Sequence, residues 1–76
     1  MSAEQFQELE AEYERLKAAA RRKRDVNESS GPSEWFQVVG DARWELREFC
    51  LATGKDITLL QSRFNEEDLV LANLGS

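Results

Sequence analysis

The chain has 76 residues, and its 15 acidic and 10 basic side chains give a formal net charge of −5. This length allows one small domain, or a helical arm joined to a very small domain, and folding buries only about 60% of the surface of so short a chain. The single cysteine excludes an internal disulfide, and the lack of histidine and of any CxxC spacing excludes a zinc site. We therefore expect no cofactor and no metal.

From the sequence we expect neither a membrane-spanning segment nor a secretion signal. No apolar run approaches the about 20 residues that are needed to span a bilayer. The start of the chain, residues 1–4, is polar and acidic, which is unlike a secretory signal. We expect a cytoplasmic protein without a membrane partner.

The first segment carries apolar residues at alternating steps of three and four. This spacing, with a content rich in alanine, glutamate, leucine, lysine and arginine, predicts an amphipathic helix over about residues 3–26. We treat residues 1–26 as a helical arm. The apolar face covers just over two heptads, short of the three or four that establish a coiled coil. We call this face the seam, and it consists of Phe6, Leu9, Tyr13, Leu16 and Ala20.

Charges along this helix are sorted by sign, with acids in the first half and bases in the second. The order complements the helix dipole, but most pairs four residues apart are alike and repel, such as Glu8 with Glu12. Antiparallel pairing with a second copy would lay acids against bases. The sequence therefore favours self-association or a protein partner at the seam, and leaves open whether the helix packs on its own chain.

A linker and a second helix follow. Residues 27–32 form the linker because Gly31 and Pro32 interrupt a helix, and Pro32 suits the first turn of the next one. We predict that this second helix runs from about Pro32 or Ser33 to Ala52 and is stopped by Gly54. Residues 33–76 would form a small helical module.

The second helix is apolar on two sides. The side expected to form the core carries Trp35, Val38, Val39, Ala42, Leu46, Phe49 and Cys50. The opposite side carries Phe36, Gly40, Trp44 and Leu51, and it needs a cover. One interpretation folds the arm back so that Phe6, Tyr13 and Leu16 lie over Phe36, Trp44 and Leu51. The other leaves Trp44 exposed as the anchor of a partner site, because tryptophan is common at interface hot spots.

Two shorter helices are expected in the last third of the chain. Asp56 is positioned to cap a turn that carries Ile57, Leu60 and Phe64. Asn65 is positioned to cap a last helix that ends before Gly75. The predicted fold is all-α: a long amphipathic N-terminal helix followed by a compact unit of about three helices. Because a unit of 44 residues is rarely stable alone, we expect the arm or a second copy to complete it.

Little in the sequence supports catalysis or small-molecule chemistry. Without histidine, a general base near neutral pH would need a strongly perturbed carboxylate or lysine. Cys50 has no histidine to activate it and falls on the core side of its helix. Successive acids such as Glu66 and Glu67 point in different directions on a helix and do not converge on one ion. We predict no catalytic residue, no enzyme activity and no small-molecule substrate.

One cluster offers a different hypothesis, because four successive bases end the first helix and resemble a phosphate-binding surface. No aromatic residue is interleaved with them, and residues 33–76, with eight acidic and four basic side chains, should repel nucleic acid. A dimeric nucleic-acid-binding regulator is therefore the less favoured alternative. The cluster consists of Arg21, Arg22, Lys23 and Arg24.

The favoured hypothesis is a non-enzymatic protein–protein interaction module. It would be a small adaptor, assembly factor or inhibitor of the kind found among phage and mobile-element proteins. Sorted charges would set the orientation of the complex and speed its formation more than they raise affinity. The predicted partner-binding residues are Phe6, Leu9, Tyr13, Leu16, Ala20 and Trp44.

Overall fold

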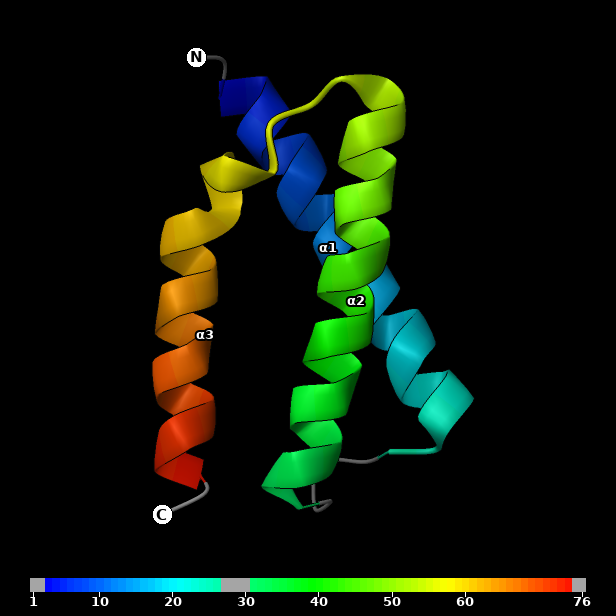
Figure 1. The fold of residues 1–76 in the computed structure, drawn as a ribbon, viewed down its shortest axis with the longest axis vertical. Helices are drawn as coiled ribbons and strands as arrows, with labels where there is room; N and C mark the ends of the chain where they lie inside the picture. Colours follow the sequence, from blue (N-terminus) through cyan, green and yellow to red (C-terminus); the bar gives the residue numbers. More distant parts are fainter. Residues whose placement is uncertain (1–2, 27–30, 75–76) are drawn as a thin grey trace.

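The structure is a computed structural model that describes residues 3–26 and 31–74. Within these ranges the chain is all-α, without a strand, as the sequence predicts. A long first helix of 22 residues is followed by a second of equal length, a short 3₁₀ turn and a final helix (Figure 1). The elements are α1 (Ala3–Arg24), α2 (Pro32–Thr53), η1 (Ile57–Leu60) and α3 (Gln61–Leu74).

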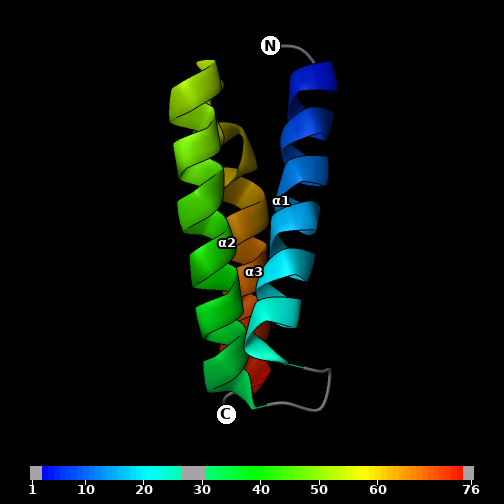
Figure 2. The ribbon, with the colours of Figure 1, turned by 90° about the vertical axis from the view of Figure 1, so that its right-hand side faces the viewer.

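Helices α1 and α2 form an antiparallel pair along most of their length, and α3 lies against one side of this pair (Figure 2). In Figure 1, α1 crosses behind α2, and the chain turns at the upper end of α2 to bring η1 and α3 back alongside it. The most extensive contact is between α1 and α2. The segment predicted as a helical arm therefore packs against the segment predicted as the helical module.

Helix α1 ends in a Schellman motif, the common arrangement in which a left-handed residue closes a helix. Asp25 has a φ of 56°. Its N–H donates to the carbonyl of Arg22 at 3.2 Å, and the N–H of Val26 donates to the carbonyl of Arg21 at 3.0 Å. Val26 is buried in a small cluster with Ala20, so the turn fixes the end of the helix against the protein.

The boundaries of α2 agree with the prediction. Gly31 is the N-cap residue, and Pro32 lies in the first turn. At the other end Gly54 adopts a φ of 74°, and its N–H donates to the carbonyl of Cys50. Glycine suits this position because it has no Cβ to oppose a left-handed backbone.

The start of the last helix differs from the prediction. Asp56 caps η1 as expected, because its carboxylate accepts a hydrogen bond from the N–H of Thr58 at 3.0 Å. However, η1 continues directly into α3, so Asn65 lies inside a helix and is not a cap. Its side chain instead accepts a hydrogen bond from Gln61 at 3.1 Å. The predicted stop at Gly75 lies outside the described residues.

The predicted core side of α2 is the core of the protein. Val38, Val39, Ala42, Leu46 and Cys50 are buried, and Trp35 and Phe49 are partly buried against the same clusters. The main cluster joins α1, α2, η1 and α3 and consists of Leu9, Tyr13, Leu16, Ala42, Leu46, Cys50, Leu60 and Phe64.

Helix α1 covers this core side, and not the second apolar side of α2. The interpretation in which Phe6, Tyr13 and Leu16 lie over Phe36, Trp44 and Leu51 is therefore wrong. The physical reason is that η1 and α3 supply few apolar residues to the core, chiefly Leu60, Phe64 and Leu71. Seven apolar residues on the core side of α2 need more cover than that, and α1 provides it.

Candidate functional site

The seam lies inside the molecule. Leu9 and Tyr13 have no exposed surface, and Leu16 and Ala20 are also buried, while Phe6 is partly buried against the main cluster. The sequence left open whether the seam packs on its own chain, on a second copy or on a partner. In the structure it packs on its own chain. These residues offer no surface to a partner while α1 remains in place.

The acidic half of α1 meets basic residues from the other end of the chain. Glu8 lies 2.7 Å from the ammonium group of Lys55. Glu10 lies 2.6 Å from the guanidinium group of Arg63, which also contacts Glu14. These acids therefore have intramolecular partners on α3 and on the segment between α2 and η1.

The basic half of α1 is paired in the same way with acids of α2 and α3. Lys17 lies 2.8 Å from Glu67, and Arg24 lies 2.7 Å from Asp41. The packing of α2 and α3 against α1 brings such opposite charges together, so sorted signs do not require a second copy. Sequence reasoning searched for partners four residues apart or on another chain, and it missed these tertiary pairs.

A polar network joins α1, α2 and α3 at the edge of the main cluster. The hydroxyl of Tyr13 donates a hydrogen bond to Glu67. Arg43 donates to the same carboxylate at 3.0 Å and to the Tyr13 hydroxyl at 3.2 Å. Lys17 donates to the other carboxylate oxygen at 2.8 Å. One carboxylate of α3 thus binds side chains of both other helices.

The network changes the acidity of its members. Burial alone would raise the pKa of Glu67, but hydrogen bonds from Lys17, Tyr13 and Arg43 outweigh it and leave this pKa lowered. Burial, together with the hydrogen bond to Glu67, raises the pKa of Tyr13 well above its ordinary value of 10.0. The network therefore contains a carboxylate and a phenol that donates to it. The hydroxyl of a buried tyrosine usually has a hydrogen-bond partner. The position of Tyr13 on the apolar face of its helix was therefore the one sequence feature from which such a network could be inferred.

The outer side of α2 is the exposed apolar surface of the helix pair. Phe36, Trp44 and Leu51 expose 47%, 61% and 71% of their surface. Five exposed residues lie on this face of α2, because successive steps of four, four, three and four residues return to the same side of a helix. We call these residues the outer stripe: Phe36, Gly40, Trp44, Arg47 and Leu51. Trp44 is the one predicted partner-binding residue that is largely exposed.

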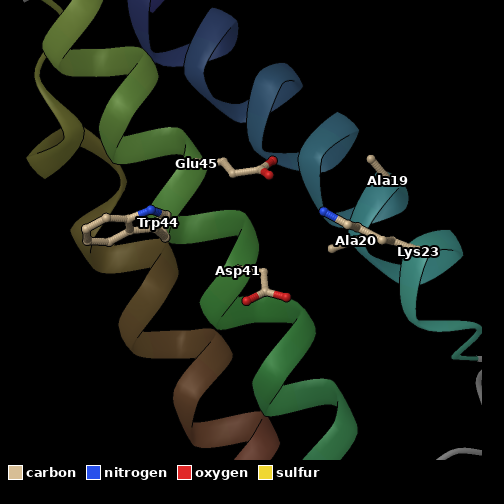
Figure 3. A pocket seen from close by; sticks show the side chains of 6 residues that line it. All are labelled: Ala19, Ala20, Lys23, Asp41, Trp44 and Glu45. Atoms are coloured by element: carbon tan, nitrogen blue, oxygen red, sulfur yellow. The ribbon is translucent and has the colours of Figure 1, made fainter.

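An open groove of about 380 Å³ lies between α1 and α2 beside the outer stripe. Figure 3 shows Glu45 pointing from α2 towards α1, while the ring of Trp44 points away from α1. Helix α1 contributes two alanines and a lysine to the lining, and α2 contributes two carboxylates and a tryptophan. In the described part of the chain no group of three potential metal ligands is present. The lining residues are Ala19, Ala20, Lys23, Asp41, Trp44 and Glu45.

The basic cluster at the end of α1 is divided by the fold. The guanidinium of Arg21 lies 5.2 Å from the centre of the Trp35 ring. Arg24 donates hydrogen bonds to Asp41 and to Gln37, both at 2.7 Å. Arg22 and Lys23 are exposed and form no ion pair with any described residue. Two of the four bases are thus engaged within the chain, which reduces the continuous surface that a phosphate backbone would meet.

Cys50 lies in the main cluster, where it is buried. Burial raises the pKa of its thiol, which favours the protonated form. This environment is that of a small apolar core side chain, as the sequence predicted.

None of the helices that the structure describes is both long and apolar enough to cross a membrane. The long helices are instead amphipathic, and their apolar sides are those described above. Comparison of the chain with family models, with curated proteins and with solved structures finds no match to any of them.

Proposed function

We propose that this protein is a non-enzymatic protein–protein interaction module, a small adaptor, assembly factor or inhibitor, that binds through the outer stripe of α2. The observation that carries the proposal is the exposure of Trp44 between Phe36 and Leu51. Exposed apolar patches on small proteins often mark contact sites, and tryptophan is among the commonest hot-spot residues. We therefore assign Trp44 the role of anchor.

The seam supports this function indirectly, by holding α2 in place. Leu9, Tyr13 and Leu16 pack against the core side of α2, and Arg43 ties the same helix to Glu67 and Asp68 of α3. A helix fixed on one side presents its other side as a preformed surface. Preformed surfaces lose less conformational freedom on binding, which favours affinity.

The proposal predicts that Trp44→Ser weakens binding to the natural partner by about 30-fold or more, since a hot-spot residue contributes at least about 2 kcal/mol. The measurement is quantitative capture of partners by the tagged full-length protein from its source cells. Circular dichroism checks that the variant remains helical, as expected for a residue that is 61% exposed.

Leu69→Ser is the matched control, because Leu69 is exposed to a similar extent, at 67%, but lies on α3. We expect this variant to capture the same proteins as the wild type. If Trp44→Ser and the wild type capture the same proteins in the same amounts, the outer stripe is not the contact surface.

A further inference from the structure

Gly40 lies in the middle of α2, where a glycine weakens the helix relative to alanine. A Cβ placed on Gly40 would meet nothing within 4 Å. Packing within the described part of the chain therefore does not require a glycine at this position. Gly40 is exposed and lies on the outer stripe. A glycine at such a position allows another helix to approach closely from outside.

The outer stripe has nearly the same spacing in either direction, with a large apolar residue at each end but a glycine and an arginine at its two inner positions. Trp44 stands at its centre, with Gly40 four residues before it and Arg47 three residues after it. A large apolar residue stands at each end, Phe36 eight residues before Trp44 and Leu51 seven residues after it. An antiparallel second copy would therefore place Phe36 against Leu51 and the long side chain of Arg47 against Gly40.

We infer that the occupant of the outer stripe is a second copy of this chain, paired antiparallel through α2 around a two-fold axis at Trp44. This inference rests on the proposed function and names its partner. In the pair, each Arg47 lies over Gly40 of the second copy, and the two Trp44 rings meet at the axis. The interface is isologous, as in most homodimers.

Charge supports the same register. Arg47 is exposed and forms no ion pair with any residue in the ranges 3–26 and 31–74. Asp41 follows Gly40 directly, and Arg24 contacts only its Oδ2 atom at 2.7 Å. Arg47 of the second copy, lying over Gly40, reaches the carboxylate of Asp41, so the interface pairs a cation and an anion twice.

The size and charge of the surface set the strength of the pair. From Phe36 to Leu51 the stripe is about 22 Å long, at about 1.5 Å per residue. One helix face of this length buries less than the about 800 Å² per partner of a standard interface. The net charge of −5 also repels a second copy. We therefore expect a weak, reversible pair that associates more tightly as salt screens the repulsion.

Sedimentation velocity of the full chain from about 1 to 500 µM tests the inference. We expect a reversible monomer–dimer equilibrium that Trp44→Ser weakens at least about tenfold. Gly40→Gln should weaken it similarly while raising the melting temperature by about 4 °C, because glutamine favours the helix but blocks the approach. If Gly40 had no role in association, Gly40→Gln would raise the melting temperature without weakening the dimer. Leu69→Gln, the control on α3, should leave the equilibrium unchanged.

Orientation is tested by disulfide trapping. Phe36→Cys combined with Leu51→Cys, in a Cys50→Ala background, places thiols about 22 Å apart within one chain, which is too far for an internal bond. The antiparallel pair brings them together between chains, so oxidation should yield a covalent dimer. The same double variant carrying Gly40→Gln should yield much less.

A wild type that stays monomeric throughout the range, or a dimer that Gly40→Gln leaves intact, overturns the inference. Such a result leaves the proposed function standing if Trp44→Ser still loses a captured heterologous protein. If capture is also unaffected, both the second-copy inference and the proposed function fall.

Discussion

Leu9→Asp is expected to lower the stability of the fold severely. Leu9 has no exposed surface in the main cluster, and the substitution both removes a core side chain and buries a carboxylate without a partner. Together these effects cost about 4–5 kcal/mol or more. A chain of 76 residues has a total free energy of unfolding of about 4–11 kcal/mol. Far-ultraviolet circular dichroism and chemical denaturation measure the loss.

Leu69→Asp is the matched control, because it makes the same substitution at a leucine that is 67% exposed. We expect it to change the free energy of unfolding by about 0.5 kcal/mol or less. If Leu9→Asp leaves the helix content and the melting temperature unchanged, α1 is not packed on α2 and the seam is free for a partner.

Glu67→Gln is expected to lower the free energy of unfolding by about 1.5–3 kcal/mol at neutral pH. The reason is that one carboxylate accepts hydrogen bonds from Tyr13, Lys17 and Arg43. Glutamine keeps the shape but removes the charge that these donors face. Urea denaturation of the variant and the wild type measures the difference. Glu66→Gln, a change at an exposed neighbour on the same helix, should have little effect.

The same pair of proteins tests the lowered pKa of Glu67. Since the folded pKa lies below the ordinary value of 4.5, the ionised carboxylate stabilises the fold above pH 4.5, and this contribution is lost as the pH falls through the lowered pKa. The difference between wild type and Glu67→Gln should thus be full at neutral pH and shrink in acid. A difference that is independent of pH would show that the charge of Glu67 does not stabilise the fold.

The local patterns of the sequence were sufficient to predict the helices and their buried faces. Spacing placed Leu9, Tyr13 and Leu16 on one face, and Val38, Ala42 and Leu46 on another, because helical periodicity alone decides which residues share a side. Gly54 and Asp56 marked their boundaries through well-understood capping chemistry. These features depend on neighbours within a few positions along the chain.

Features that depend on the tertiary arrangement were not predictable in the same way. The two sides of α2 are both apolar, so the sequence did not decide which side α1 covers. The ion pairs of Glu10 with Arg63 and of Lys17 with Glu67 join residues that are far apart along the chain. Asparagine is a favoured N-cap residue, but α3 follows η1 directly and begins at Gln61, four residues before Asn65.

The sorted charges of α1 show how the same pattern has two physical explanations. Antiparallel pairing of α1 with a second copy would satisfy them, and so does antiparallel packing on α2 with α3 beside it. The intramolecular solution leaves α1 without an apolar face to offer. Exposed apolar side chains remain on the outer stripe and, at Leu69 and Val70, on α3. Because the outer stripe includes an exposed tryptophan, we place the anchor at Trp44 and not at the seam.

The emission of Trp44 tests this account most directly. Trp35→Phe leaves Trp44 as the only tryptophan, since the chain contains two. In dilute protein we expect emission typical of a water-exposed indole that acrylamide quenches readily. On binding a partner, or at concentrations where copies associate, the emission should shift to the blue and quenching should fall. Emission and quenching that stay constant in the complex would contradict the assignment of Trp44 as the anchor.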